Sequence, residues 1–259
     1  MILPRVIPCL LLKDRGLVKT IKFKNPIYVG DPRNAVKIFN EKEVDELIIL
    51  DITATLESRG PKFDIIHEIV SEAFVPVAYG GGIRNINDAR SILYQGVEKI
   101  VINTYAVENP SFIQEASNIL GSQSVVVCMD VKKGFLGKYE TYISGGQKRT
   151  KVDPVRFAKQ IEEMGAGELV VNSIDRDGTK RGYDLEIIKS VTDAVNIPVI
   201  ALGGAGKIED FRNAVFEGGA SAVAAGSLFV FQGKLSAVLI NYPEQFALRQ
   251  IFADGKQCH

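Results

Sequence analysis

Residues 75–107, VPVAYGGGIRNINDARSILYQGVEKIVINTYAV, are repeated 122 positions later as residues 197–229, IPVIALGGAGKIEDFRNAVFEGGASAVAAGSLF. Each copy predicts a buried strand, a glycine turn, an amphipathic helix and a second buried strand. The chain therefore predicts two half-barrel repeats, about 1–122 and 123–232, followed by a C-terminal extension over 233–259.

Short runs rich in Val, Ile and Leu predict buried parallel strands, each followed by a covering helix. They lie at 5–11, 46–51, 75–79, 98–103, 124–130, 168–173, 197–202 and 221–226. Four strands alone would leave unpaired sheet edges, so the two halves are expected to close together. The predicted fold is a (β/α)8 TIM barrel spanning 1–259, a size typical of barrels of about 250 residues.

Charge and cysteine content narrow the class of protein. Lys plus Arg and Asp plus Glu both number 31, so the chain offers no general attraction to nucleic acid or an anionic membrane. The three cysteines are an odd number, which argues against a disulfide framework and favours the cytoplasm. The only histidines, His67 and His259, show no metal-ligand spacing, so neither a metal nor another cofactor is expected.

Glycine clusters follow three of the predicted strands, at the end where TIM barrels bind ligands. They are Gly80-Gly81-Gly82, Gly203-Gly204 and Gly226-Ser227. Backbone N–H groups at the start of a helix suit a phosphate, so the repeat predicts two phosphate sites on opposite sides of one mouth. The alternative is that these are ordinary turn glycines. Other polar groups expected at the rim are Asn103, Thr104, Ser144, Asp177 and Gly178.

Two aspartates end otherwise apolar strands, which places carboxylates at the barrel mouth. Asp130 is the predicted general acid or base, whereas Asp51 fits loop bracing equally well. Lys13 and Lys19 are expected in the loop after the first strand, where Lys19 could clamp an anionic ligand. The repeat, at an offset of 119, places Leu11 opposite Asp130, and leucine cannot move a proton.

Several longer motifs resemble one family across about residues 1–230. They are RVIPCLLLKDRGLVK (5–19), DELIILDITAT (45–55), GGGIRNINDA (80–89), KIVINTYAVENPSFI (99–113), GAGELVVNSIDRDGTKRGYD (165–184) and GGAGK (203–207). The chain resembles the synthase, or cyclase, subunit of imidazole glycerol phosphate synthase, a lyase of histidine biosynthesis. The SIDRDGT and VENP segments favour this synthase over the related isomerase of the same pathway.

The resemblance implies a partner and an internal path. In that family a glutaminase subunit docks on the N-terminal face of the barrel as a heterodimer, and ammonia passes along the barrel axis to the C-terminal face. A ring of charged residues guards the entrance, and its positions here are Arg5, Glu46, Lys99 and Glu168. The alternative is a purely structural ring at the base of the barrel.

On the catalytic face the resemblance is incomplete. The family's two catalytic aspartates fall at positions 11 and 130, and only Asp130 is present. The family's ligand-binding positions are retained at Lys19, Gly81, Gly82, Asn103, Thr104, Asp177, Gly178, Gly203 and Gly204, but Asn172 replaces the usual threonine. The C-terminal FVFQGKLSAVLINYPEQF (229–246) also departs from the family.

This combination resembles a divergent branch of the family associated with surface-polysaccharide loci. There the subunit is thought to pass ammonia to a sugar amidotransferase that converts an acetamido group to an acetamidino group. The first hypothesis is thus an ammonia-conducting subunit with weakened cyclase chemistry. The second is an ordinary cyclase of histidine biosynthesis, and the third is a non-catalytic scaffold that binds phosphate.

Overall fold

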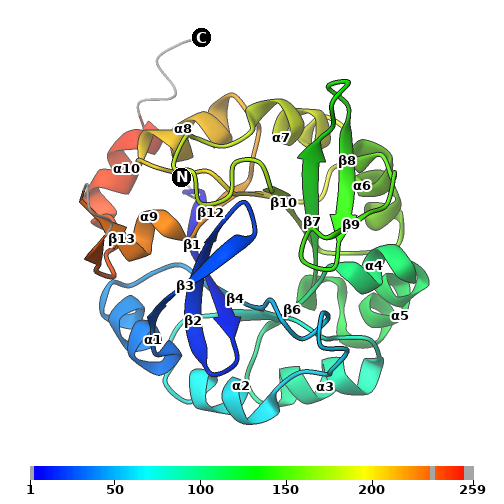
Figure 1. Cartoon of the computed structure of the whole chain (residues 1–259), viewed down its shortest axis with the longest axis horizontal. Helices are drawn as coiled ribbons and strands as arrows, with labels where there is room; N and C mark the ends of the chain where they lie inside the picture. The colour runs from blue at the N-terminus through cyan, green and yellow to red at the C-terminus, as the bar shows by residue number, and fades with distance from the viewer. Residues whose placement is uncertain (1–2, 234–236, 254–259) are drawn as a thin grey trace.

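The computed structural model describes residues 3–233 and 237–253, and its centre is a closed barrel of eight parallel strands (Figure 1). In order around the barrel these are β1 (Arg5–Lys13), β4 (Leu47–Asp51), β5 (Val77–Gly80), β6 (Lys99–Ile102), β7 (Val125–Lys133), β10 (Glu168–Ser173), β11 (Val199–Leu202) and β12 (Ala222–Ala225). β12 pairs with β1 from Arg5↔Ala222 to Pro8↔Ala225, which closes the circle. The predicted TIM barrel is confirmed.

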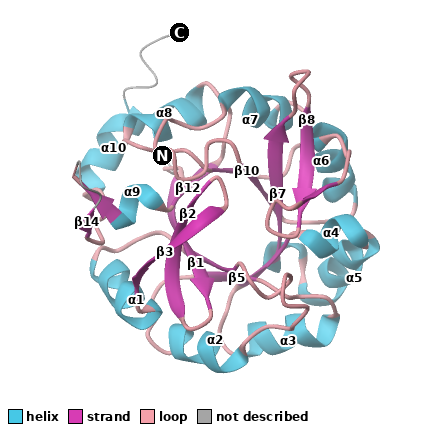
Figure 2. Ribbon diagram, viewed as in Figure 1, coloured by secondary structure: helices cyan, strands magenta, loops and turns pink. Residues whose placement is uncertain are grey.

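An outer layer of helices covers the barrel (Figure 2). It consists of α1 (Pro32–Glu41), α2 (Phe63–Val70), α3 (Ile86–Tyr94), α5 (Ser111–Leu120), α6 (Pro154–Glu163), α7 (Leu185–Thr192), α8 (Glu209–Phe216) and α10 (Gln245–Ala253), with short α4 (Thr104–Glu108), η1 (Ser122–Ser124) and α9 (Ser227–Val230) between them. Asp31 and Asp153 cap α1 and α6 by accepting a backbone N–H, and a proline follows each cap. These caps start matching helices in the two repeats.

The last covering helix comes from the predicted C-terminal extension. Leu248 and Phe252 of α10 are buried in the core, and the Tyr242 hydroxyl donates to the Val6 carbonyl at 2.8 Å. Tyr242 and α10 therefore pack on the barrel wall and complete the outer layer. No helix in the described parts of the chain is long and apolar enough to cross a membrane.

Two hairpins modify the expected pattern at the C-terminal face. β2 (Gly16–Ile21) and β3 (Lys24–Gly30) follow β1 and lie across the barrel mouth (Figure 1). β8 (Tyr139–Ile143) and β9 (Lys148–Arg149) follow β7. Because β2 and β8 pair antiparallel with β1 and β7, these two barrel strands extend to Lys13 and Lys133, beyond their predicted ends.

The strands divide the core into two parts. Larger side chains pack between the barrel wall and the helices. The barrel interior holds a second apolar cluster of Ile7, Cys9, Ile48, Ala78, Val101, Val126, Cys128, Val170, Ile200, Leu202, Ala222 and Ala224. This apolar interior separates the charged residues at the two ends of the barrel axis.

Candidate active site and barrel entrance

A cavity of about 330 Å³ lies at the carboxyl ends of the barrel strands. The predicted site residues that line it are Lys19, Gly81, Gly82, Asn103, Thr104, Asp130, Asp177, Gly226 and Ser227, together with Lys13, Asp51 and Asn172. Phe23 and Pro26 of the β2–β3 hairpin line it as well. The cavity is therefore bounded both by strand ends and by the hairpin across the mouth.

Asp130 is held on both carboxylate oxygens by amide groups. Asn103 Nδ2 donates to Oδ2 and Asn172 Nδ2 donates to Oδ1, both at 2.9 Å. Burial raises the pKa of Asp130 to about 7, although the two amide hydrogen bonds act in the opposite direction. A carboxyl group with a pKa near neutrality can both accept and release a proton, which suits acid–base chemistry.

The wall contributed by β1 carries no second acid. Leu11, with Leu50, Val101 and Leu202, gives the cavity an apolar surface. Leu11 is half-buried rather than fully enclosed. Of the pair of carboxylates at matching positions of β1 and β7, the cavity thus has only Asp130.

Lys19 belongs to strand β2, so its predicted place in a loop after the first strand is wrong. Lys13 is likewise the last residue of β1. The buried Lys19 ammonium donates to the Cys9 carbonyl and lies against the Cα of Gly226, where any other residue would carry a Cβ. Burial lowers the pKa of Lys19 and raises that of Asp177. Lys19 is thus held beside the Gly226 turn, and the charge of Asp177 acts on it from within the same cavity lining.

Four predicted rim residues lie outside the cavity lining: Ser144, Gly178, Gly203 and Gly204. Gly178 and Gly204 have positive φ angles and pack directly on the Thr20 and Gly182 carbonyls, leaving no room for a Cβ. The Ser144 backbone N–H donates to Thr104 Oγ1 at 3.0 Å.

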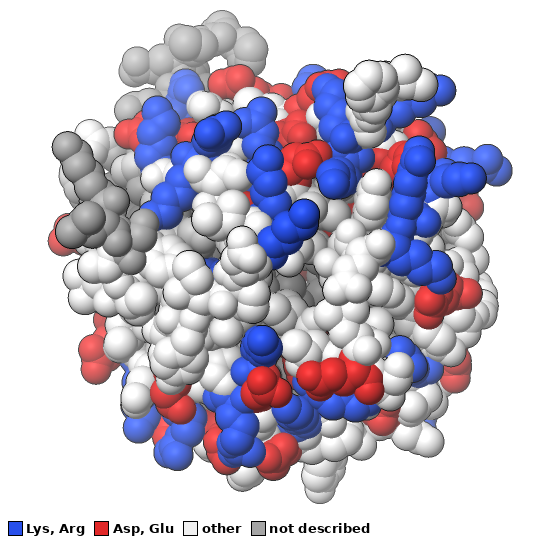
Figure 3. All heavy atoms as spheres, in the orientation of Figure 1, with Lys and Arg blue, Asp and Glu red and all other residues white. Residues whose placement is uncertain are grey.

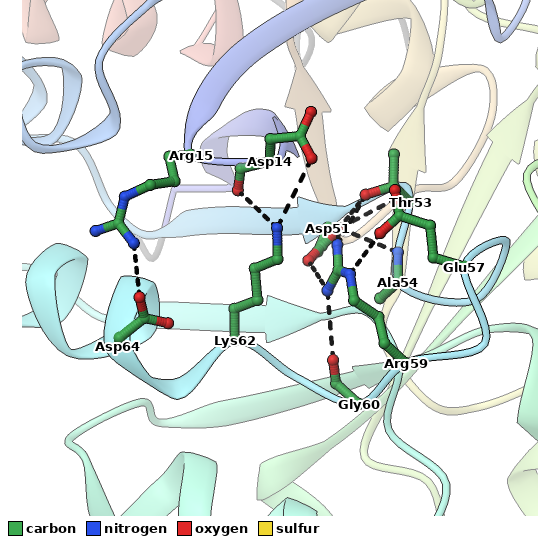
Figure 4. A network of polar contacts seen from close by, with 10 residues as sticks. All are labelled: Asp14, Arg15, Asp51, Thr53, Ala54, Glu57, Arg59, Gly60, Lys62 and Asp64. Atoms are coloured by element: carbon green, nitrogen blue, oxygen red, sulfur yellow. Dashed lines mark hydrogen bonds and ion pairs between the residues drawn. The ribbon is translucent and has the colours of Figure 1, made fainter.

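Asp51 braces the loop after β4 (Figure 4). Its Oδ1 accepts from the backbone N–H groups of Thr53 and Ala54 at 3.1 and 3.2 Å, and Arg59 Nη1 lies 2.8 Å from its Oδ2. With both oxygens engaged, Asp51 fits the loop-bracing alternative and is poorly placed to replace a missing acid.

At the other end of the barrel, four charged side chains form a closed ring. Arg5, Lys99 and Glu168 are the first residues of β1, β6 and β10, and Glu46 directly precedes β4. Arg5 pairs with Glu46, and its Nη2 lies 2.8 Å from Glu168. Lys99 Nζ lies 2.9 Å from Glu46 and 3.3 Å from Glu168.

Each cation of this ring therefore bridges both anions, and the ring covers the base of the apolar interior.

Among the described residues, no group of three or more His, Cys, Asp or Glu side chains could hold a metal ion. Cys9 and Cys128 are free thiols inside the barrel. His259 and Cys258 lie outside the described residues.

A family model described as histidine biosynthesis protein matches residues 5–236, which includes every barrel strand, the cavity and the entrance ring. The chain belongs to this family. A Pseudomonas aeruginosa relative provisionally named as imidazole glycerol phosphate synthase subunit hisF2 is 51% identical over 244 residues, which are 94% of this chain and 97% of the relative.

Two further relatives carry the name imidazole glycerol phosphate synthase subunit HisF. The Pyrococcus furiosus protein is 47% identical over 230 residues, or 88% of this chain and 90% of its own. The Alkaliphilus metalliredigens protein is 46% identical over 229 residues, which are 88% of this chain and 91% of that protein. Within the family, the chain's kinship is thus with HisF-type cyclase subunits of this synthase.

The titration of Asp130 leads to a stability prediction. Unfolding restores the ordinary pKa of 3.8, so between about pH 4 and pH 7 the unfolded chain ionises while the native carboxyl still holds its proton. Above pH 7 the native carboxyl is ionised as well, and the full cost of burying its charge then lowers the free energy of unfolding. We expect Asp130→Asn to raise the free energy of unfolding by about 2 kcal/mol at pH 8 and to change it little near pH 4.

Denaturant unfolding at the two pH values measures this difference. Asn103→Ala is the matched comparison, because it removes a donor that stabilises the charged carboxylate and should destabilise the chain most at pH 8. Equal stability of Asp130→Asn and the unchanged chain at pH 8 would contradict a strongly raised pKa.

Proposed function

We propose that this chain is the ammonia-conducting subunit of a glutamine amidotransferase complex, with weak or absent cyclase activity of its own. A glutaminase subunit on the N-terminal face supplies ammonia, which crosses the barrel to the C-terminal face. A separate sugar amidotransferase then uses it to convert an acetamido to an acetamidino group. The observation that carries this proposal is Leu11, which lines the cavity with Asp130 where the second carboxylate is expected.

The entrance ring and the barrel interior support conduction. Neutral ammonia crosses an apolar interior far more readily than ammonium, whose transfer from water is costly. The closed ring of Arg5, Glu46, Lys99 and Glu168 separates that interior from solvent at the glutaminase side. Breaking one ion pair of the ring would let ammonia enter the barrel, so we expect glutaminase docking and ring opening to be linked.

At the far end, the retained groups suit binding of a phosphorylated small molecule. Lys19 supplies a cation, and Gly81, Gly82, Gly226 and Ser227 supply backbone at the cavity wall. Asp130, held by Asn103 and Asn172, is available for one proton transfer. The free thiols Cys9 and Cys128 agree with a cytoplasmic location for this complex.

A direct assay tests the proposal. The purified chain is supplied with ammonium salt and the formimino-ribulosyl substrate of the cyclase, and imidazole glycerol phosphate formation is measured. Losing one general acid or base costs about 10²- to 10⁴-fold, so we expect a rate lower by at least about 10²-fold than that of a HisF subunit with both aspartates. Equal rates would contradict the proposal.

A second candidate is an ordinary cyclase that makes imidazole glycerol phosphate and aminoimidazole carboxamide ribotide. It is favoured by the pKa of about 7 for Asp130 and by relatives named as synthase subunits. The neighbouring genes distinguish the two candidates. A sugar amidotransferase gene beside a glutaminase gene supports the first, and a histidine operon supports the second.

A further inference from the structure

The hairpin between β7 and β8 forms an arm that stands beyond the ring of helices (Figure 1). We define the docking arm as residues 131–143. Its strands pair from Val131↔Thr141 to Lys133↔Tyr139. Hydrogen bonds from Gly137 N to Gly134 O at 3.0 Å and from Gly134 N to Lys138 O at 2.8 Å close the turn. The arm tip is therefore a defined turn.

Two large apolar side chains occupy the corners of that turn. Phe135 is fully exposed and Leu136 is 84% exposed. Turn corners ordinarily carry Gly, Pro, Asn, Asp or Ser. Leaving such side chains in water forgoes about 1.5–3 kcal/mol of burial free energy for each of them. An apolar pair at the tip of a projecting hairpin is typical of a contact that is buried only in a complex.

Positive charge flanks the apolar tip. Lys132 and Lys138 are exposed, and neither lies within ion-pair distance of a carboxylate in the described residues. The acid of the arm, Glu140, is already paired with Arg149. Figure 3 shows Lys and Arg interspersed with Asp and Glu over this face as a whole, so the positive character is that of the arm itself. A partner surface that complements the charge of the arm is therefore acidic.

A small phosphorylated ligand does not account for these residues, because none of Lys132, Phe135, Leu136 and Lys138 lines the cavity. The arm is nevertheless continuous with the cavity wall. Its first strand is the outer half of β7, and the last residue before it is Asp130. A protein bound to the arm would thus be anchored at the edge of the face where ammonia emerges.

We propose that the docking arm binds the ammonia-accepting enzyme, with Phe135 and Leu136 inserted into an apolar pocket ringed by Asp and Glu on that enzyme. This proposal rests on the proposed function. Ammonia released into neutral water is protonated and diffuses away, so an acceptor enzyme seated on the mouth keeps it neutral and close. The arm supplies the affinity, and its lysines accelerate association and make it dependent on salt.

The test uses the full chain with its purified glutaminase and the purified sugar amidotransferase. Sedimentation velocity and surface plasmon resonance measure binding of the amidotransferase to the chain. We expect Phe135→Ser/Leu136→Ser to weaken binding at least tenfold, and Lys132→Gln/Lys138→Gln to slow association and flatten its salt dependence. Val238→Ser/Leu239→Ser changes two adjacent exposed apolar residues away from the arm and should bind as the unchanged chain does.

A second readout separates the arm from the proposed function. With glutamine as nitrogen source, amidation should fall at least tenfold in Phe135→Ser/Leu136→Ser, while glutaminase binding and amidation fed by ammonium salt stay unchanged. If the unchanged chain supports glutamine-dependent amidation and the arm variant matches it in binding and rate, the arm proposal is wrong. If the unchanged complex transfers no nitrogen from glutamine, the proposed function is wrong. Self-association lost in the arm variant would instead assign the arm to a second copy of this chain.

Discussion

Replacing Leu11 by aspartate is expected to raise ammonia-dependent cyclase turnover of the purified chain by about 10²-fold or more. Leu11 lines the cavity from β1 and is half-buried, so a carboxylate at this position would face the cavity and keep part of its hydration. Asp130 stays clamped by Asn103 and Asn172. The variant would then hold the two carboxylates that the repeat predicts.

Leu11→Asn is the matched control, because asparagine has the size and polarity of aspartate but cannot exchange a proton near neutral pH. We expect it to leave turnover near the level of the unchanged chain. Steady-state formation of imidazole glycerol phosphate from the formimino-ribulosyl substrate provides the measurement. A high rate before substitution and no gain in Leu11→Asp would favour the ordinary cyclase, with its chemistry carried by Asp130 and another group.

Replacing Lys99 by methionine is expected to uncouple glutamine hydrolysis from amidation. Lys99 holds both Glu46 and Glu168, and Glu46 is only 3% exposed, so the substitution leaves Arg5 to bridge two carboxylates. The ring loses one side, and ammonia can escape at the entrance. We expect the ratio of glutamate formed to acceptor amidated to rise about tenfold, and the free energy of unfolding to fall by about 2 kcal/mol.

Lys99→Arg keeps the charge and should retain most of the coupling. Amidation fed directly by ammonium salt should be equal in both variants, since that route does not use the entrance. The two product yields are measured in the same reaction by mass spectrometry. If glutamine hydrolysis and amidation stay equally coupled in Lys99→Met, the result would support the scaffold hypothesis, in which the barrel binds phosphate and the glutaminase but conducts no ammonia.

The barrel could be predicted because the sequence pattern that specifies it is local and occurs twice in the chain. The alternation of buried strands with amphipathic helices is visible in residues 75–107 and again in 197–229, and closure follows from the unpaired edges of each half. The sequence does not predict the β2–β3 hairpin, and the reason is equally local. Its turn uses Lys22 and Phe23 with φ of 52° and 62°, where hairpins ordinarily carry Asn-Gly.

The site was only partly predictable, because several of its features depend on contacts between distant residues. Asp130 could be located from its predicted strand end, but its clamp requires Asn103, which directly follows β6, and Asn172 of β10. Gly178 was predicted at the rim and Gly204 in a glycine cluster, and in the structure each packs against a backbone carbonyl, that of Thr20 for Gly178 and that of Gly182 for Gly204. Glycine patterns predict close backbone approach, and the identity of the approaching group comes only from the fold.

The most direct test of ammonia conduction follows nitrogen from glutamine to the final acceptor. The chain, its glutaminase and the sugar amidotransferase are combined with glutamine labelled with ¹⁵N at the amide, in the presence of excess unlabelled ammonium salt. We predict that the acetamidino product carries mainly ¹⁵N, because channelled ammonia does not mix with the bulk pool. Product nitrogen that matches the unlabelled pool would contradict conduction through this barrel.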